Sequence, residues 1–334
     1  MKRLSRLLVL LILGLLTLLL LLKLGDIDIS VATLRRIDPV YLIIAIAVHY
    51  SGFAVRGWRW QKLLAGLNHR LSFTYTTALL MSGWFVSALI PARLGDVARA
   101  TMLRRDHSVP LARGFASIAA ERALDILAIL SLAAVASVWA LAGRTPGWMW
   151  QTIAGGATLF GAALVLLLAA PKLELRLLTL LPWTMYRRVM QFGFDLLDSI
   201  RQLGRRPGVL ALVAGQSVYI WLCDVFLMYF VFLSIGSATG LSISAFTSMA
   251  VDLAAAVPVI PGALGQVEGT AVGVLALFNI DPRQSSLMIL LNRFISFWTF
   301  IIASGVVTYL FGFSQALNPH NLRAGRSPVA SDNL

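Results

Sequence analysis

The 334-residue chain has few of the side chains on which most enzyme chemistry depends. It contains one cysteine, Cys223, and four histidines, His49, His69, His107 and His320. A single cysteine excludes an intrachain disulfide and a cysteine-based metal site, and the four histidines show no metal-ligand spacing. A P-loop, a Gly-x-Gly-x-x-Gly turn after a strand and a Ser-His-Asp order are also missing from the sequence. The sequence therefore predicts no metal and no cofactor.

Charged residues are scarce as well, and apolar residues take their place. Only 13 % of the residues are charged and 58 % are hydrophobic, whereas about a quarter of a soluble domain is charged. Several apolar stretches reach the roughly 20 residues that span a bilayer as a helix. These stretches lie at about 7–22, 40–55, 73–90, 115–142, 148–170, 209–234, 243–260, 263–278 and 285–312. The pattern predicts an all-α polytopic integral membrane protein with about seven spanning helices.

Acidic residues are the scarcer charge, with 15 Asp and Glu against 28 Lys and Arg, and the net charge is +13. Such a balance is also found in nucleic-acid-binding proteins, but here the positive residues are grouped as in the cytoplasmic loops of membrane proteins. We expect a bacterial cytoplasmic membrane protein with both termini cytoplasmic and no nucleic-acid partner. Of the 28 positive residues, 21 lie in five segments, 1–6, 56–72, 91–114, 171–208 and 313–334.

The same charge pattern predicts two re-entrant helical hairpins. If 56–72 and 91–114 are both cytoplasmic, the stretch 73–90 between them enters the membrane and returns. By the same count 243–278 enters from the opposite face, so the two repeats are inverted. An alternative stays open for the first hairpin, with 91–106 as a surface helix and 73–90 as a short span.

A polar motif occurs once in each predicted hairpin. Residues 90–97 read Ile-Pro-Ala-Arg-Leu-Gly-Asp-Val and residues 260–267 read Ile-Pro-Gly-Ala-Leu-Gly-Gln-Val. Proline ends one helical limb and suits the first turn of the next, and glycine permits close approach. Helices broken at the same place in two halves of a membrane protein indicate a central binding site. The hairpin-breaking residues are Pro91, Gly95, Pro261, Gly262 and Gly265.

Ionisable residues inside the apolar segments are the candidate ligands of that site. Glu121 and Asp125 are spaced i,i+4 on one helix face and need a cation nearby. Arginines together with the N-termini of broken helices suit a phosphate group. The alternative is a buried ion-pair network that pins each hairpin to the following helix. The candidate substrate-binding residues are Arg93, Asp96, Arg99, Glu121, Arg122, Asp125, Glu268, Asn292 and Arg293.

We expect one transmembrane domain over 1–315 and a disordered cytoplasmic tail over 316–334. Within the domain, repeat one covers about 40–142 and repeat two about 209–312. Residues 171–208, which join the repeats, mix aromatic, acidic and basic residues as in an amphipathic helix on the cytoplasmic leaflet.

Four motifs in order resemble the flippase-like domain of lysylphosphatidylglycerol synthases. They are Arg-Gly-x-Arg-Trp at 56–60, Pro-Ala-Arg-Leu-Gly-Asp-x-x-Arg-Ala at 91–100, Glu-Arg-x-x-Asp at 121–125 and Pro-Gly-x-Leu-Gly-x-x-Glu-Gly at 261–269. The resemblance covers roughly residues 8–315. It departs from the family pattern at Ala263, where a second glycine is usual, and nothing folded is expected after Phe313.

The resemblance implies lipid translocation without the aminoacyl transfer that a separate cytosolic domain performs in the synthases. Relatives of this kind are linked to hopanoid, polyprenyl-phosphate or glycolipid pathways, so the expected partner is an anionic phospholipid or a polyprenyl or glycolipid phosphate. The motifs do not imply an enzyme. Two alternatives stay open, namely a membrane-embedded transferase acting on a lipid phosphate and a non-catalytic partner of a lipid-synthesis enzyme.

Overall fold

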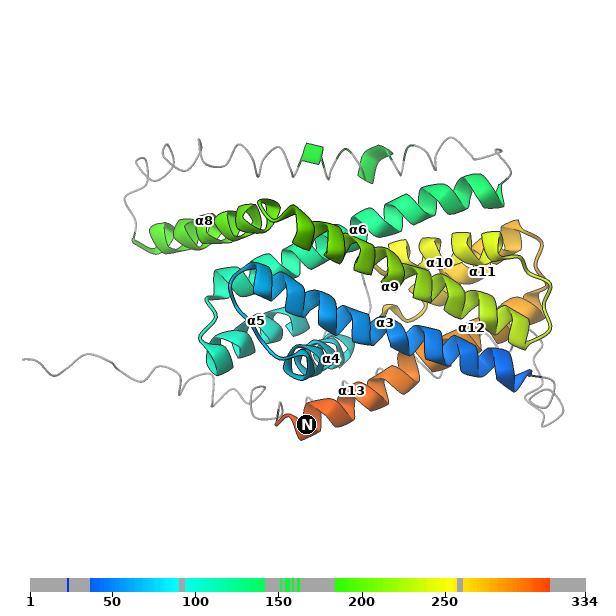
Figure 1. Cartoon of the computed structure of the whole chain (residues 1–334). Coiled ribbons are helices and arrows are strands. Elements are labelled where there is room, and N and C mark those ends of the chain that lie inside the picture. Colours follow the sequence, from blue (N-terminus) through cyan, green and yellow to red (C-terminus); the bar gives the residue numbers. More distant parts are fainter. Residues whose placement is uncertain are drawn as a thin grey trace, which may run out of the picture.

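The computed structural model describes residues 37–89, 94–141, 184–256 and 261–312, with a few isolated residues elsewhere. All elements in these ranges are helical and run as one bundle (Figure 1). The all-α prediction is confirmed for this part of the chain. Several predicted features lie outside the described residues, namely the stretch 7–22, most of 148–170, Pro91, Arg93 and the tail 316–334.

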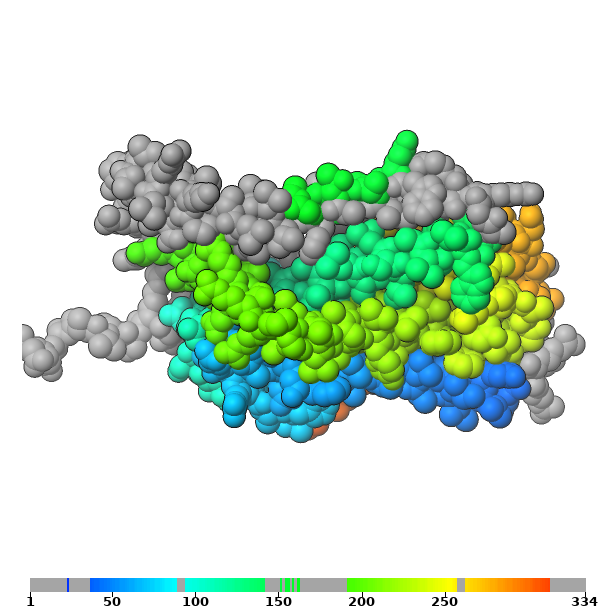
Figure 2. Space-filling view, turned by 45° about the horizontal axis from the view of Figure 1, so that its top comes forward, coloured from blue at the N-terminus to red at the C-terminus, as the bar shows by residue number. Residues whose placement is uncertain are grey.

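Four long helices in the described residues are apolar enough to cross a membrane. They are α3 (Pro39–Gly66), α6 (Leu111–Ala140), α9 (Pro207–Ser234) and a composite helix, Pro282–Leu310. The composite helix consists of α12 (Pro282–Arg293), a π-helical turn (Phe294–Trp298) and α13 (Thr299–Leu310). At about 1.5 Å per residue, helices of this length exceed the roughly 30 Å of a bilayer's hydrocarbon core. In the space-filling view α3, α9 and α6 lie in successive layers (Figure 2).

Two pairs of shorter helices lie between the long ones. In the first pair α4 (Phe73–Leu89) packs on α5 (Leu94–His107), and in the second α10 (Leu241–Ala255) packs on α11 (Gln266–Leu277). A 3₁₀ turn, Pro261–Ala263, precedes α11. The pairs are packed crosswise, because α4 lies against α13 of the second half and α10 lies against α6 of the first. Each half therefore has the same order of a long helix, two short helices and a long helix.

The charge pattern misplaced one boundary. We expected α3 to end near residue 55 and a cytoplasmic segment to follow, but α3 continues to Gly66. Arg56 and Arg59 are only 5 % and 1 % exposed, and Arg99, also counted as cytoplasmic, is fully buried. All three are paired with acidic side chains of the bundle. Because their charge is neutralised inside the protein, these arginines do not mark a loop.

The connector between the halves is helical from Thr184 to Gly204 (α8). Its apolar side packs on α6 and α9, with Leu203 in a cluster that includes Leu63 and Val213. Phe192 meets Phe115 of α6 edge-on, with ring centroids 6.0 Å apart. The described part of the predicted connector is thus a helix that packs against α6 and α9, and its place on the cytoplasmic leaflet stays a prediction.

Gly95 holds α4 and α5 together, and Gly95→Ala should separate them. A Cβ at this position would collide with the Gly83 carbonyl oxygen and the Ser87 hydroxyl of α4, and the Gly95 N–H donates to Ser87 Oγ at 3.2 Å. Overpacking of this kind costs about 1–3 kcal/mol, which a lower melting temperature in detergent would report. Gly215→Ala on α9 is the control, since a Cβ there has no neighbour within 4 Å. An equal effect of both substitutions would contradict the close α4–α5 contact.

Candidate functional site

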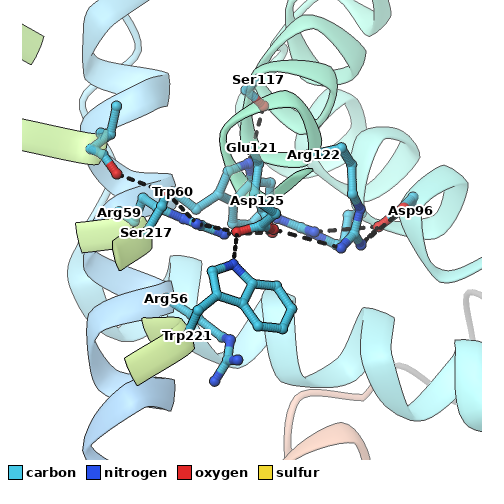
Figure 3. Close-up of polar contacts among 12 residues, drawn as sticks. Arg56, Arg59, Trp60, Asp96, Ser117, Glu121, Arg122, Asp125, Ser217 and Trp221 are labelled. Carbon is cyan, nitrogen blue, oxygen red and sulfur yellow. Dashed lines mark hydrogen bonds and ion pairs between the residues drawn. The ribbon is translucent and has the colours of Figure 1, made fainter. Parts of the chain in front are cut away.

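A network of ion pairs and hydrogen bonds joins four helices in the interior, with Arg59 of α3 at one end (Figure 3). Its two terminal nitrogens donate to both oxygens of Asp125 on α6, at 2.5 and 3.1 Å. Ser217 of α9 accepts a further hydrogen bond from Arg59 at 2.7 Å, and the Trp221 indole donates to Asp125 Oδ1 at 3.0 Å. A forked guanidinium–carboxylate pair with two additional partners fixes α3, α6 and α9 relative to one another.

The middle of the network is sealed from solvent. Arg99 of α5 donates to Glu121 Oε2 at 2.8 Å, and neither side chain has any exposed surface. The Arg99 guanidinium also lies 4.0 Å from the centroid of the Trp60 ring. Glu121 Oε1 is 3.5 Å from Arg59, so one carboxylate balances the arginines of two helices. These groups are held by the protein itself and leave no access for a ligand.

Arg122 occupies the accessible end of the network. Its Nη2 contacts both oxygens of Asp96, at 3.1 and 3.2 Å, and its Nη1 is 4.0 Å from Asp125. The Arg122 side chain is 30 % exposed, against 17 % for Asp96 and 9 % for Asp125. Its Nε has no hydrogen-bond partner. Arg122 is thus the most exposed cation of the described network.

The first network therefore brings together five of the nine predicted ligands, Asp96, Arg99, Glu121, Arg122 and Asp125. Arg93 lies outside the described residues. The described members carry three positive and three negative charges, so they balance. This arrangement matches the predicted ion-pair network in the part around Arg99, whereas the Arg122 side chain is partly exposed.

Glu268 and Arg293 form a second network at the break between α10 and α11. Arg293 Nε donates to Glu268 Oε1 at 2.7 Å, and Arg293 Nη2 donates to the Gly262 carbonyl at 2.9 Å. The other Glu268 oxygen accepts the Gly265 N–H at 2.7 Å. Both oxygens of Glu268 are therefore used to hold the turn to the composite helix. Asn292 accepts a hydrogen bond from Ser296 of the same helix at 3.4 Å.

The backbone at this break explains the glycines of the motif. Gly262 and Gly265 have φ angles of +67° and +78°, and Ala263 between them has +50°. L-residues rarely adopt such values, and glycine does so without strain. The π-helical turn begins directly after Arg293, and π turns inside helices are frequent at functional sites. Within the described residues, no hydrogen bond or ion pair joins this second network to the first.

Sequence reasoning missed Arg59, Ser217 and Trp221 as members of the first network. Arg59 was assigned to a cytoplasmic segment, and its partner Asp125 lies 66 positions away. One signal was available, because Glu121 and Asp125 on one face call for more positive charge than Arg122 alone supplies. The partner's identity, however, depends on how α3 packs on α6.

Glu121→Gln should destabilise the bundle strongly. The substitution keeps the size of the side chain but leaves Arg99 buried with Asp96 as its remaining carboxylate, 3.3 Å away. Removal of one partner from a buried ion pair costs about 3–5 kcal/mol. Thermal unfolding in detergent should show a large loss for Glu121→Gln and little for Asp198→Asn, whose carboxylate is exposed on α8. A small effect of Glu121→Gln would contradict the sealed pairing.

Comparison with known proteins gives one family and several distant relatives. The sequence model described as the lysylphosphatidylglycerol synthase TM region matches residues 6–304. A UPF0104 membrane protein of Methanocaldococcus jannaschii is 24 % identical over 241 residues, which cover 71 % of this chain and 98 % of that protein. Another, of Pyrococcus horikoshii, is 24 % identical over 307 residues, with 85 % and 90 % covered.

A third relative has a more specific name. Glycosyltransferase AglD of Haloferax volcanii is 31 % identical over 108 residues, which are 32 % of this chain and 17 % of that protein. No solved structure matches the chain.

Proposed function

The chain belongs to the family of the lysylphosphatidylglycerol synthase transmembrane region and is a multi-pass membrane protein, and on this basis we propose that it moves an anionic lipid between the leaflets of the cytoplasmic membrane. The cargo is an anionic phospholipid or a polyprenyl or glycolipid phosphate. One observation carries the proposal, namely the 30 % exposure of Arg122 at the edge of an otherwise sealed charge network.

Arg122 is suited to hold the phosphate of the headgroup. Its guanidinium already binds the two oxygens of Asp96, and a phosphate offers oxygens of the same spacing and charge. A headgroup that takes the place of Asp96 accepts the charge-assisted hydrogen bonds that Nη2 now donates to that carboxylate. Arg93, three positions before Asp96, would supply a second cation. Arg99 and Glu121 position Asp96 and Arg122 in this scheme.

The two short-helix pairs are the elements that we propose to move. They are re-entrant hairpins of inverted repeats, and their crosswise packing on α13 and α6 supports a twofold relation between the halves. The 3₁₀ turn at Pro261–Ala263 packs on α4, so the break of the second hairpin touches the first. In transporters of inverted repeats, movement of one repeat against the other opens a central site to alternate faces.

A membrane-embedded transferase is the second candidate, and the partial match to a glycosyltransferase favours it. That match covers 17 % of the relative, which leaves most of the relative's own length unmatched. A transferase would consume its donor in detergent, where no leaflets exist. A translocase acts only across a sealed bilayer, so this single comparison separates the two functions.

Leaflet exchange of a fluorescent anionic phospholipid in sealed proteoliposomes tests the proposal. The wild-type protein should accelerate exchange, and Arg122→Gln and Arg93→Ala should each slow it about tenfold or more, because each removes a positive charge that we propose holds the phosphate, and a tenfold change corresponds to about 1.4 kcal/mol. Arg104→Gln is the matched control, since Arg104 is an exposed residue of α5 and should leave the rate unchanged.

Two results would contradict the proposed function. One is the absence of exchange with every phosphate-bearing lipid tested, polyprenyl phosphates included. The other is an equal loss of exchange in Arg104→Gln and Arg122→Gln, which would mean that Arg122 acts through bulk surface charge. Folding of each variant is checked by size-exclusion chromatography and thermal unfolding.

A further inference from the structure

A separate group of charged side chains lies where α3 packs on α9. Arg56 Nη2 donates to Asp224 Oδ2 at 3.1 Å, and His49 Nδ1 contacts Asp224 Oδ1 at 3.2 Å. Arg56 and Asp224 are each the eighteenth residue of a 28-residue helix, so they meet at matching positions of the two halves. His49 and Arg56 are buried, with 4 % and 5 % exposure.

Asp252 of α10 adds a second carboxylate to this group. It interacts electrostatically with both Asp224 and Arg56, and its hydrogen bond comes from Ser248 Oγ at 3.4 Å. No cation is paired directly with Asp252 among the described side chains. We refer to His49, Arg56, Asp224 and Asp252 as the α3–α9–α10 cluster.

The charged groups of the other helices packed on α10 are engaged elsewhere. On α6, Asp125 is bound by Arg59, and on α11, Glu268 is bound by Arg293. The α3–α9–α10 cluster must therefore balance its own charge.

The balance of the cluster requires one proton. Arg56 supplies one permanent positive charge, and Asp224 and Asp252 supply two negative charges when both are ionised. With a neutral His49 the net charge is −1, and an uncompensated charge inside an apolar bundle is costly. One added proton makes the cluster neutral.

Unused polar atoms show that the cluster is not closed by hydrogen bonds in the present arrangement. His49 Nε2 and Arg56 Nη1 are buried and have no hydrogen-bond partner. A buried donor or acceptor without a partner carries a desolvation penalty. Two nitrogens of the cluster are therefore left without a hydrogen bond in this arrangement.

Trp221 connects the cluster to the network proposed to bind the headgroup. The Arg56 guanidinium lies 5.8 Å from the centroid of the Trp221 ring, and the Trp221 indole donates to Asp125 Oδ1 at 3.0 Å. Arg56 and Arg59 follow one another by one turn of α3, and Figure 3 shows Arg56 and Trp221 on one side of the network. A change of charge in the α3–α9–α10 cluster or in the first network therefore affects the other electrostatically through Trp221.

We propose that the α3–α9–α10 cluster is a proton-binding site that takes up one proton with each anionic headgroup. This inference rests on the proposed lipid transport. A proton on Asp252 removes the net negative charge beside the headgroup site and so favours binding of an anion, and by linkage the anion favours binding of the proton. A singly charged lipid and one proton together cross the membrane without net charge. The proton enters from one aqueous side and leaves to the other, so no further reactant is needed.

A pH gradient across sealed proteoliposomes tests the coupling. The membrane potential is clamped at zero, and the outside is one pH unit more acidic than the lumen. The wild-type protein should concentrate labelled anionic lipid in the inner leaflet, with a limit of about tenfold for one proton per lipid. Asp252→Asn should abolish the enrichment, and Asp195→Asn, an exposed control on α8, should retain it. Exchange without enrichment would overturn the coupling and leave the proposed function intact, and enrichment in the outer leaflet would overturn co-transport.

Tryptophan fluorescence in detergent tests the proton site without transport. Trp84 and Trp221 lie 5.4 and 5.8 Å from the Arg56 guanidinium, so both rings sense the charge of the cluster. The wild-type protein should show a one-proton transition that Asp252→Asn removes and Asp195→Asn keeps. Ser248→Ala, which removes the hydrogen bond to Asp252, should move the midpoint to higher pH. No transition in the wild-type protein, or an unchanged transition in Asp252→Asn, would overturn the site even if no lipid is moved.

Discussion

The arrangement of the bundle depends on the neutralisation of arginines inside an apolar protein. Arg59 and Arg99 have almost no exposed surface, and their partners Asp125 and Glu121 are one turn apart on α6. A charge left alone in such a place costs several kcal/mol, so α3 and α5 can dock on α6 only where both carboxylates are in reach. The positions of three helices therefore follow from one pair of acidic residues.

A salt bridge between the second short helix and the long helix that follows occurs in both halves, with the acidic and basic residues exchanged. Arg99 on the second short helix of the first half pairs with Glu121 on the long helix that follows. In the second half the short helix supplies the acid, Glu268, and the long helix supplies Arg293. Each of these salt bridges holds a short-helix pair against the next long helix. In the proposed movement, a pair held in this way stays with its long helix, and the sliding surfaces are the crosswise contacts of α4 with α13 and of α10 with α6.

Composition and local sequence pattern predict where the helices of this fold lie. They predict less well which side chains of other helices each charged residue contacts. The apolar stretches indicated the long helices, and the Pro and Gly of the repeated motif indicated both breaks, because these residues act on their own backbone. The burial of Arg56 and Arg59 could not be predicted in this way. The rule that positive residues mark cytoplasmic loops considers only the sequence around each arginine. The acidic partners of Arg56 and Arg59, Asp224 and Asp125, lie on other helices. The spacing of Glu121 and Asp125 indicated that cations were needed but not which helix supplies them.

The charge balance of the first network also determines how the two proposed sites act on each other. Its described members are neutral while Arg122 binds Asp96. An anionic headgroup that takes the place of Asp96 on Arg122 brings the region to a net charge of −1, in surroundings where such a charge is poorly tolerated. A proton on Asp252 removes one negative charge from the α3–α9–α10 cluster, which Trp221 connects to the network, and so lowers the total negative charge around the bound headgroup. In the proposed transport cycle, lipid binding at Arg122 and proton binding at Asp252 therefore favour each other electrostatically.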